Sequence, residues 1–133
     1  MIVVDTSLLV YLLLPGEQSA QARAVLQEDP RWAAPLLWRS EFRNVLLLYL
    51  RRGKIGLAEA EALAGQAEVR MMGAEFPVES RRVLALAASS GCTAYDCEFV
   101  ALAMDLGVPL VTTDSQLLKE FPAVAVSPAR FAA

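Results

Sequence analysis

Four acidic residues that are far apart in the sequence stand where their carboxylates could act together: Asp5, Glu41, Asp96 and Asp114. Asp5 and Asp114 each follow a short apolar run directly, and the carboxyl ends of parallel strands open into one crevice. Glu41 and Asp96 lie near the starts of predicted helices, on faces that helical spacing turns inward. Because no histidine or nearby lysine neutralises them, a hard divalent cation such as Mg²⁺ or Mn²⁺ is the economical partner for these oxygens.

Each acid also has a simpler structural interpretation. Asp5 and Asp114 could serve only as N-caps of the helices that follow them. Thr93 and Asp96 have the spacing of a capping box, and a glutamate such as Glu41 is common in a first helical turn. Glu98, about 200° around the helix from Asp96, is expected to face solvent. The chemical interpretation therefore depends on the four acids being found together.

The absence of histidine restricts the chemistry further. It excludes catalytic triads that use an imidazole, zincin sites and nucleases with a histidine base. Cys92 and Cys97 are too few for a structural zinc site, and we expect them to be buried, reduced thiols. The remaining candidates are acids, hydroxyls, lysine, tyrosine or a metal ion held by oxygen.

The composition predicts one globular domain that covers residues 1–133, because 56% of the residues are hydrophobic and only 20% are charged. No apolar run is long enough to cross a bilayer, and the run from Val45 to Leu50 is followed by two arginines. The N-terminus lacks the basic region of a signal peptide. We therefore expect a cytoplasmic protein with no membrane partner.

Apolar runs and helical spacing alternate along the whole chain. Strands are predicted at 1–4, 32–37, 72–76, 109–113 and 123–126, and helices at 8–14, 17–28, 38–52, 57–69, 78–90, 94–106 and 115–120. This alternation predicts an α/β fold in which helices flank a central parallel sheet. Trp32, Trp38, Phe42 and Tyr49 are expected in the core or at an interface, with base stacking as the alternative.

Four strings of residues resemble the PIN-domain ribonucleases, especially toxins of the VapC type. They are Val3-Val4-Asp5-Thr6-Ser7, Glu41-Phe42-Arg43-Asn44-Val45-Leu46, Tyr95-Asp96-Cys97-Glu98-Phe99-Val100-Ala101-Leu102-Ala103 and Leu110-Val111-Thr112-Thr113-Asp114. They occur in the family's order and cover nearly the whole chain. One departure is Ser115, which stands where family members often place a basic residue.

The resemblance implies a PIN-like three-layer α/β/α fold and a metal-dependent endoribonuclease that cleaves single-stranded RNA. Asp5, Glu41, Asp96 and Asp114 would then hold one or two Mg²⁺ or Mn²⁺ ions, which activate water for attack on the phosphodiester. Ser7 and Thr112 would supply supporting hydroxyls, and Asn44 an orienting amide. The resemblance also implies a homodimer and a cognate antitoxin protein, so that the chain would be the toxin of a toxin–antitoxin pair.

Basic residues gather on and after the predicted helix at 38–52. Arg39, Arg43, Arg51 and Arg52 are candidates for contacts with single-stranded or structured RNA, although they would also suit a solvated helix surface. The formal net charge of −3 argues against an RNA-binding protein. Without the four clustered acids, however, the rest of the chain is slightly basic, and bound metal would largely cancel the objection.

The alternative is a non-catalytic α/β binding or signalling module with an acidic pocket. A phospho-receiver domain pairs acids at the end of its first strand and needs a lysine after a late strand, but Asp5 stands alone and the only lysines are Lys54 and Lys119. A haloacid-dehalogenase-like phosphatase needs an aspartate where this chain has Ser7. An inactive PIN scaffold stays open as a third possibility.

Overall fold

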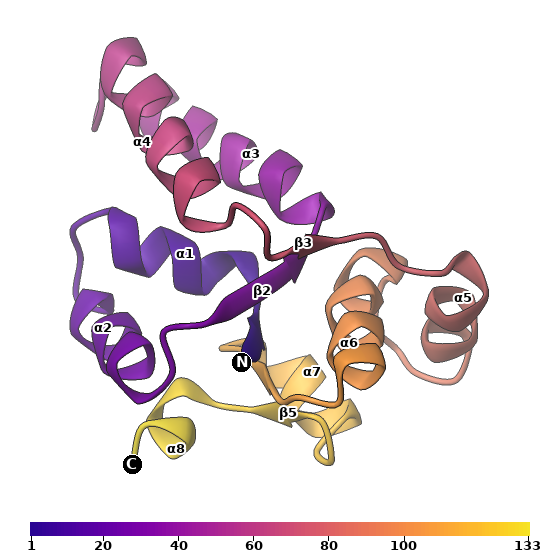
Figure 1. Ribbon diagram of the computed structural model, residues 1–133. Coiled ribbons are helices and arrows are strands. Elements are labelled where there is room, and N and C mark those ends of the chain that lie inside the picture. Colours follow the sequence, from indigo (N-terminus) through magenta and orange to yellow (C-terminus); the bar gives the residue numbers. More distant parts are fainter.

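A computed structural model describes residues 1–133 and contains one five-stranded sheet, in the order β3-β2-β1-β4-β5 (Figure 1). The strands are β1 (Ile2–Val4), β2 (Trp32–Pro35), β3 (Glu75–Phe76), β4 (Leu110–Val111) and β5 (Ala125–Val126). Every neighbouring pair is parallel. The first strand in the sequence therefore occupies the centre of the sheet, as expected for an uninterrupted apolar run that is buried on both faces.

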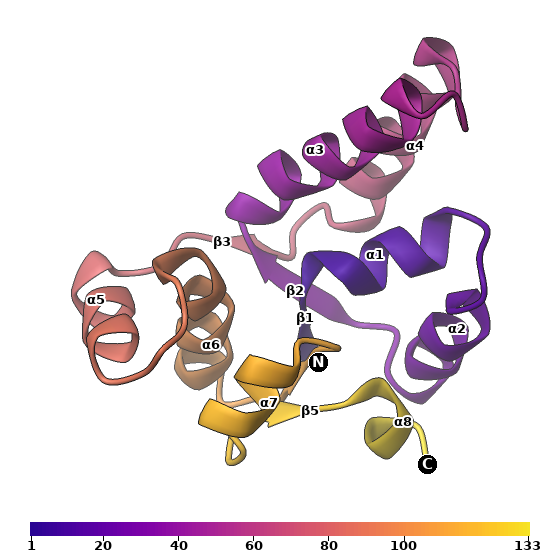
Figure 2. The same cartoon turned by 180° about the vertical axis from the view of Figure 1, so that it is seen from behind.

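Eight helices surround this sheet: α1 (Thr6–Leu13), α2 (Ser19–Glu28), α3 (Leu37–Arg51), α4 (Leu57–Arg70), α5 (Ser80–Ala88), α6 (Ala94–Leu106), α7 (Ser115–Glu120) and α8 (Pro128–Phe131). Helices α1 and α2 lie on one side of the sheet and α5 and α6 on the other (Figure 1). The view from behind places α7 and α8 near β5, at one edge of the sheet (Figure 2). The predicted three-layer α/β/α architecture is confirmed.

Helices α3 and α4 pack against each other and project away from the sheet, forming what we call the α3–α4 arm (Figure 2). Arg39 near the start of α3 fixes its base. Its guanidinium donates to both carboxylate oxygens of Glu75 in β3, at 2.6 and 2.9 Å, and to Glu68 of α4 at 2.8 Å. Trp38 Nε1 also donates to Glu75, at 2.7 Å. This network joins both helices of the arm to the edge of the sheet.

Helix α6 is the most deeply buried helix and packs against β1, β2 and β4. Its first turn is capped by the Thr93 hydroxyl, which accepts a hydrogen bond from the backbone N–H of Asp96 at 3.1 Å. Its last turn ends at Gly107 in the left-handed conformation, with φ of 67°, which glycine adopts without steric cost. The position of Asp96 is thus set by a helix that is anchored at both ends.

The predicted element boundaries differ from the structure at several places. The predicted strand 32–37 ends at Pro35 because Leu37 already begins α3, and the predicted strand 72–76 is reduced to two residues. Helix α1 begins two residues earlier than predicted, directly after its Asp5 cap, and the short helix α8 was not predicted. None of the helices is both long and apolar enough to cross a membrane.

Candidate functional site

The four acids singled out in the sequence line one cavity of about 490 Å³ at the carboxyl ends of the strands. Asp5 follows β1, Asp114 comes shortly after β4, and these strands are paired so that Val4 lies opposite Val111. Glu41 comes from α3 and Asp96 from α6. The other lining residues are Thr6, Ser7, Val10, Tyr11, Val45, Tyr49, Phe99, Thr113 and Leu117, so no lysine or arginine is among them.

Asp5 is held by hydrogen bonds from two hydroxyls. Ser7 Oγ donates to its Oδ1 at 2.5 Å, and Thr112 Oγ1 donates to its Oδ2. The backbone N–H of Leu8 also donates to Oδ1 at 3.3 Å, which makes Asp5 the N-cap of α1. Burial nevertheless raises the pKa of Asp5 above its usual value, because desolvation of the carboxylate outweighs these hydrogen bonds.

The fully buried hydroxyl of Thr112 joins the two strand-end acids. While it donates to Asp5, it accepts a hydrogen bond at 3.0 Å from the backbone N–H of Asp114. The Asp114 side chain turns the other way and caps α7, where Oδ1 accepts from the N–H groups of Gln116 and Leu117 at 2.9 and 3.1 Å. The second oxygen of Asp114 has no partner among the hydrogen bonds of the protein.

Glu41 has a hydrogen-bond partner that the sequence analysis missed. Thr6, at the first position of α1, donates its hydroxyl hydrogen to Glu41 Oε1 at 2.7 Å. Thr6 is buried and Glu41 is half-buried. The only sequence signal for this pairing is that Thr6 follows Asp5 directly, which brings a hydroxyl to the same strand end. The contact ties the starts of α1 and α3 together beside the cavity.

Burial and neighbouring acids raise the pKa values of Glu41 and Asp96. Burial is the largest cause for both Glu41 and Asp96. The charges of Asp96 and Asp5 raise the pKa of Glu41 further, and those of Asp114 and Asp5 raise the pKa of Asp96. Such mutual repulsion without a basic counter-charge is typical of functional sites, and bound cations relieve it.

The predicted supporting residues fall into two groups. Ser7 and Thr112 contact Asp5, and Ser7 Oγ also lies 3.1 Å from Thr113 Oγ1, a hydroxyl that the sequence analysis did not single out. Asn44, by contrast, is exposed on α3, has no side-chain hydrogen bond and does not line the cavity. The structure therefore gives no support for Asn44 as an orienting amide.

The four candidate arginines also differ in their surroundings. Arg43, Arg51 and Arg52 are exposed and form no ion pair. Arg39 instead binds Glu75 and Glu68, and its guanidinium holds the pKa of Glu75 below the usual value. Arg39 shares a helix face with Arg43, but acids from β3 and α4, which are distant in sequence, engage it in the fold. We therefore assign Arg39 to the α3–α4 arm rather than to a substrate surface.

Other sequence expectations have mixed outcomes. Cys92 and Cys97 are buried free thiols, and burial raises the pKa of both. Trp32, Trp38 and Phe42 lie in the core, whereas Tyr49 is half-buried and lines the acidic cavity.

The expectation that Glu98 faces solvent is wrong. Glu98 is half-buried, and its charge contributes to the raised pKa of Glu41.

The polar groups of the cavity fit a hard divalent cation. Most of these polar groups are carboxylates and hydroxyls. Their oxygen atoms are ligands of the kind that Mg²⁺ and Mn²⁺ prefer. No three acidic or thiol side chains are close enough in this arrangement to hold one ion directly. Mg²⁺ is commonly bound through one or two carboxylates with water in the remaining positions, so the donor set suits it.

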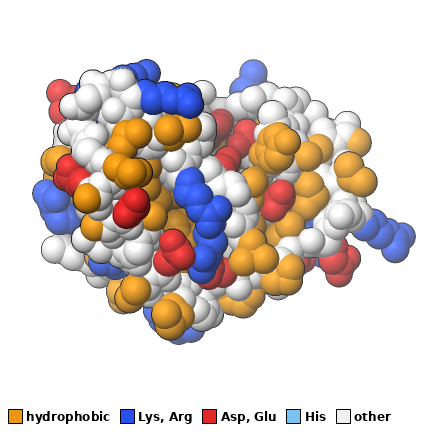
Figure 3. Space-filling view, turned by 90° about the horizontal axis from the view of Figure 1, so that it is seen from above, with side chains coloured by type: hydrophobic (Ala, Val, Ile, Leu, Met, Phe, Trp, Pro, Cys, Tyr) orange, Lys and Arg blue, Asp and Glu red, His pale blue; other side chains and the backbone are white.

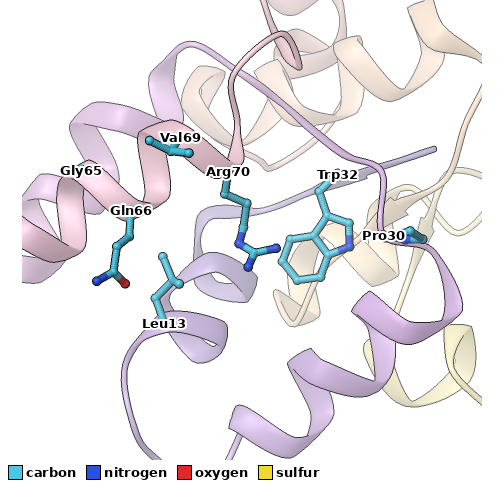
Figure 4. Close-up of a pocket in the computed structure, with 7 residues that line it drawn as sticks. All are labelled: Leu13, Pro30, Trp32, Gly65, Gln66, Val69 and Arg70. Atoms are coloured by element: carbon cyan, nitrogen blue, oxygen red, sulfur yellow. The ribbon is translucent and has the colours of Figure 1, made fainter.

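A wider cavity of about 700 Å³ lies elsewhere, between the end of α1, the residues before β2 and α4 (Figure 4). It is lined by Leu13, Pro30, Trp32, Gly65, Gln66, Val69 and Arg70. Arg70 extends from α4 toward the ring of Trp32 in Figure 4 and is the only charged residue of the set. No carboxylate, thiol or hydroxyl side chain lines this cavity, so the acidic cavity is the better candidate for a site of chemistry.

The raised pKa values predict an unusual pH dependence of stability. A carboxyl whose pKa is higher in the folded than in the unfolded protein binds its proton more tightly when folded. The free energy of unfolding therefore falls as pH rises through the interval between these two pKa values. In the presence of a chelator, we expect the free energy of unfolding to increase between pH 7 and about pH 5. Below this range it should fall, because the lowered pKa values of Asp29 and Glu75 reflect contacts that need the ionised carboxylates.

Urea denaturation at a series of pH values measures this dependence. Asp5→Asn is the matched control, since it removes the deepest of the titrating carboxyls and should flatten the increase. A free energy of unfolding that decreases steadily from pH 7 to pH 5 in the unsubstituted protein would contradict the assignment of raised pKa values.

Comparison with known proteins agrees with this geometry. The family model described as PIN domain matches residues 2–124, a range that includes all four acids of the cavity. Ribonuclease VapC3 from Pyrobaculum aerophilum is 34% identical over 128 residues, which cover 92% of this chain and 96% of that protein. Both matches extend over nearly the whole chain.

Solved structures share the fold at lower sequence identity. PAE2754 from Pyrobaculum aerophilum superposes with a TM-score of 0.77 at 23% identity, covering 98% of this chain and 92% of that one. A toxin–antitoxin complex from Klebsiella pneumoniae gives a TM-score of 0.71 at 17% identity, covering 96% and 98%. The family model and the identity to Ribonuclease VapC3 together show that this chain belongs to the PIN domain family.

Proposed function

We propose that this protein is a divalent-metal-dependent endoribonuclease that hydrolyses phosphodiester bonds of single-stranded RNA. One observation carries the proposal: four carboxylates from four separate elements line one cavity that contains no basic residue. Repulsion between these acids is unfavourable for folding, so their gathering needs a functional explanation. The similarity to Ribonuclease VapC3 supports RNA as the substrate.

The residues of the cavity have separable roles in this proposal. When bound, Mg²⁺ or Mn²⁺ would lower the pKa of a water molecule and stabilise the negative charge on the leaving oxygen. Asp5, Asp96 and Asp114 would be the principal ligands of one or two ions, each ion held directly by no more than two carboxylates and otherwise through water, with Glu41 binding directly or through water. Ser7 and Thr112 fix the Asp5 carboxylate, and Thr6 fixes that of Glu41. Because the chain has no histidine, any side chain that accepts a proton from water would be a carboxylate.

The proposal extends to partners and location. The similarity to Ribonuclease VapC3 and to the fold found in a toxin–antitoxin complex supports a role as the toxin of such a pair, paired with an antitoxin protein that blocks the acidic cavity. We also propose a homodimer that acts in the cytoplasm. Exposed Arg43, Arg51 and Arg52 are the cations proposed to contact RNA phosphates.

The test combines metal binding with cleavage. Millimolar Mn²⁺ should raise the melting temperature, because a cation that binds only the folded protein at 100 times its dissociation constant adds about 2.7 kcal/mol to stability. The same protein should cleave labelled single-stranded RNA with Mn²⁺ and lose this activity in excess chelator. Thermal unfolding and gel electrophoresis provide the two measurements.

The two readouts separate the possible outcomes. A melting temperature that rises without RNA cleavage would identify a non-catalytic metal-binding module and would refute the nuclease. An unchanged melting temperature together with no cleavage would refute the metal site as well. Cleavage that persists in chelator would overturn the metal dependence.

A further inference from the structure

We propose that Tyr11 and Tyr49 form a nucleobase-binding platform beside the acidic cavity, on which a single-stranded substrate stacks a base next to the cleaved phosphate. This inference rests on the proposed nuclease function and adds a subsite to it. It assigns a direction to the bound strand, from the acids past the two tyrosines toward the adjoining cavity beside the turn between α1 and α2.

The first argument is that two helices start side by side at the acids. Helix α1 begins directly after Asp5, α3 carries Glu41 in its first turns, and the Thr6–Glu41 hydrogen bond joins their starts. On α3, Glu41, Val45 and Tyr49 are spaced by four residues and therefore form one stripe. All three line the acidic cavity, as do Val10 and Tyr11 farther along α1. Each helix thus leads from an acid to a tyrosine.

The second argument is that the acidic cavity continues past the tyrosines. An adjoining cavity of about 250 Å³ lies under the turn between α1 and α2. It shares Val10, Tyr11 and Tyr49 with the acidic cavity. Its remaining lining is Leu14, Pro15, Gly16, Glu17, Gln18 and Ser19. The two tyrosines therefore stand where the acidic cavity meets the adjoining one.

The partial burial and the free hydroxyls of the two tyrosine side chains suit the binding of a ligand. Both are half-buried, which fixes the rings against the protein while one part of each remains accessible. Neither hydroxyl takes part in a hydrogen bond within the protein, and no buried polar side-chain atom lacks a partner, so both hydroxyls reach solvent. A base that stacks here finds an aromatic surface and a free hydrogen-bonding group.

The two cavities are lined by acids and by no cation, but one lysine lies beside the platform. The amino group of Lys54 lies 5.8 Å from the centre of the Tyr49 ring, and exposed Arg51 and Arg52 precede it in sequence. The face seen in Figure 3 offers no broad basic track, because basic, acidic and apolar side chains are interspersed on it. In a net acidic protein with scattered cations, contacts to phosphates contribute little to the free energy of RNA binding. Stacking of a base on the platform would add to it.

The stacking requirement also defines the substrate class. A base inside a duplex has both faces covered by its neighbours, whereas a base of a single strand can leave the stack and lie on a tyrosine. Stacking tolerates any base, because every base has a π-face. The platform therefore predicts a preference for unpaired RNA with only modest selectivity among bases.

The experiment pairs protein variants with altered RNA. Binding of fluorescein-labelled oligouridylate is measured by anisotropy with Mn²⁺, in an Asp114→Asn background that suppresses cleavage. A series of oligonucleotides carries one abasic ribose at successive positions. Tyr11→Leu and Tyr49→Leu should each weaken binding about 10-fold, the size expected for loss of one base–aromatic stack. Tyr11→Phe and Tyr49→Phe keep the ring and should bind within about 3-fold of the parent.

The abasic series provides the specific readout. At one position of the oligonucleotide, or at two adjacent positions, removal of the base should weaken its binding to the parent protein about 10-fold. The same removal should not weaken binding to the leucine variants any further, because the stack is already lost in them. Tyr95→Leu is the matched control, since Tyr95 is 64% exposed and lines neither cavity, and it should leave binding unchanged. Circular dichroism and melting temperature verify that each variant is folded.

The outcomes separate the platform from the nuclease. If the leucine variants bind like their parent, if the abasic penalty persists in them, or if Tyr95→Leu weakens binding equally, the platform is refuted even when the protein with Asp114 intact cleaves RNA. If that protein does not cleave RNA but the leucine variants lose binding at the abasic positions, the platform stands and the nuclease is refuted. If RNA binds neither to the Asp114→Asn forms nor to the protein with Asp114 intact, and the latter does not cleave it, both are refuted.

Discussion

Replacement of Asp5 by asparagine is expected to reduce RNA cleavage by about two orders of magnitude or more without unfolding the protein. Loss of one preorganised electrostatic group at a reacting centre typically costs this much in rate. The asparagine side chain would lack the charge that a divalent cation needs but would keep one oxygen as an acceptor. The expected defect is therefore chemical rather than structural.

The stability of the Asp5→Asn variant follows from the hydrogen bonds around Asp5. Its Oδ1 accepts from Ser7 and the backbone of Leu8, while Oδ2 accepts from Thr112. An amide offers only one acceptor oxygen, so one of these contacts is lost, at about 1 kcal/mol. Removal of a desolvated charge whose pKa is raised by burial offsets that cost. We expect a metal-free melting temperature within a few degrees of the parent.

Cleavage assays and thermal unfolding in chelator measure the two effects on the same preparation. Asp29→Asn provides a control for the loss of an acid outside the cavity. Asp29 is half-buried and pairs with the N-terminal amine, so its replacement should alter stability but not cleavage. Near-parental cleavage by Asp5→Asn, in protein shown to be free of contaminating nuclease, would remove Asp5 from the site.

A second pair of variants should separate the two roles of Asp114. Only Oδ1 of Asp114 caps α7, while its other oxygen has no partner within the protein. Asparagine can retain the cap with its own oxygen, whereas alanine loses it, at a typical cost of about 1 kcal/mol. We therefore expect Asp114→Asn to be as stable as the parent in chelator and Asp114→Ala to be less stable.

Both Asp114 variants should lose cleavage to the same extent, by about two orders of magnitude. Denaturation curves and cleavage rates together test the assignment. If Asp114→Asn cleaved RNA normally and only Asp114→Ala were impaired, Asp114 would be a helix cap and nothing more. Equal losses of cleavage despite unequal stabilities would show that the charge itself is required.

The residues that sequence reasoning located best are those whose position follows from one local rule. Asp5 and Asp114 come directly after strands or close to a strand end, and parallel strands that pair side by side must bring such positions to one edge of the sheet. The start of α6 could be predicted from the capping pattern of Thr93 and Asp96, which the structure contains. These features require no knowledge of tertiary contacts.

The features that were missed depend on contacts between distant segments. Thr6 meets Glu41 only because α1 packs beside α3, and Arg39 meets Glu75 only because β3 adds to the sheet beside β2. Helical spacing places Arg39 and Arg43 on one face and cannot distinguish them. The stripe of Glu41, Val45 and Tyr49 was visible in the sequence, but its significance depends on the cavity beside it.

The central position of β1 has a consequence for the timing of activity during synthesis. Asp5 is among the first residues made, yet one of the two hydroxyls that hold it belongs to Thr112, which is 107 residues later. At translation rates of about 5–20 residues per second, roughly 5–20 s separate the two. β1 meanwhile lacks its neighbour β4, and Asp114 is absent. A ribosome-bound nascent chain therefore carries an incomplete acidic cavity. Under the proposed function, it would not cleave RNA, its own messenger included, until the last strands have emerged.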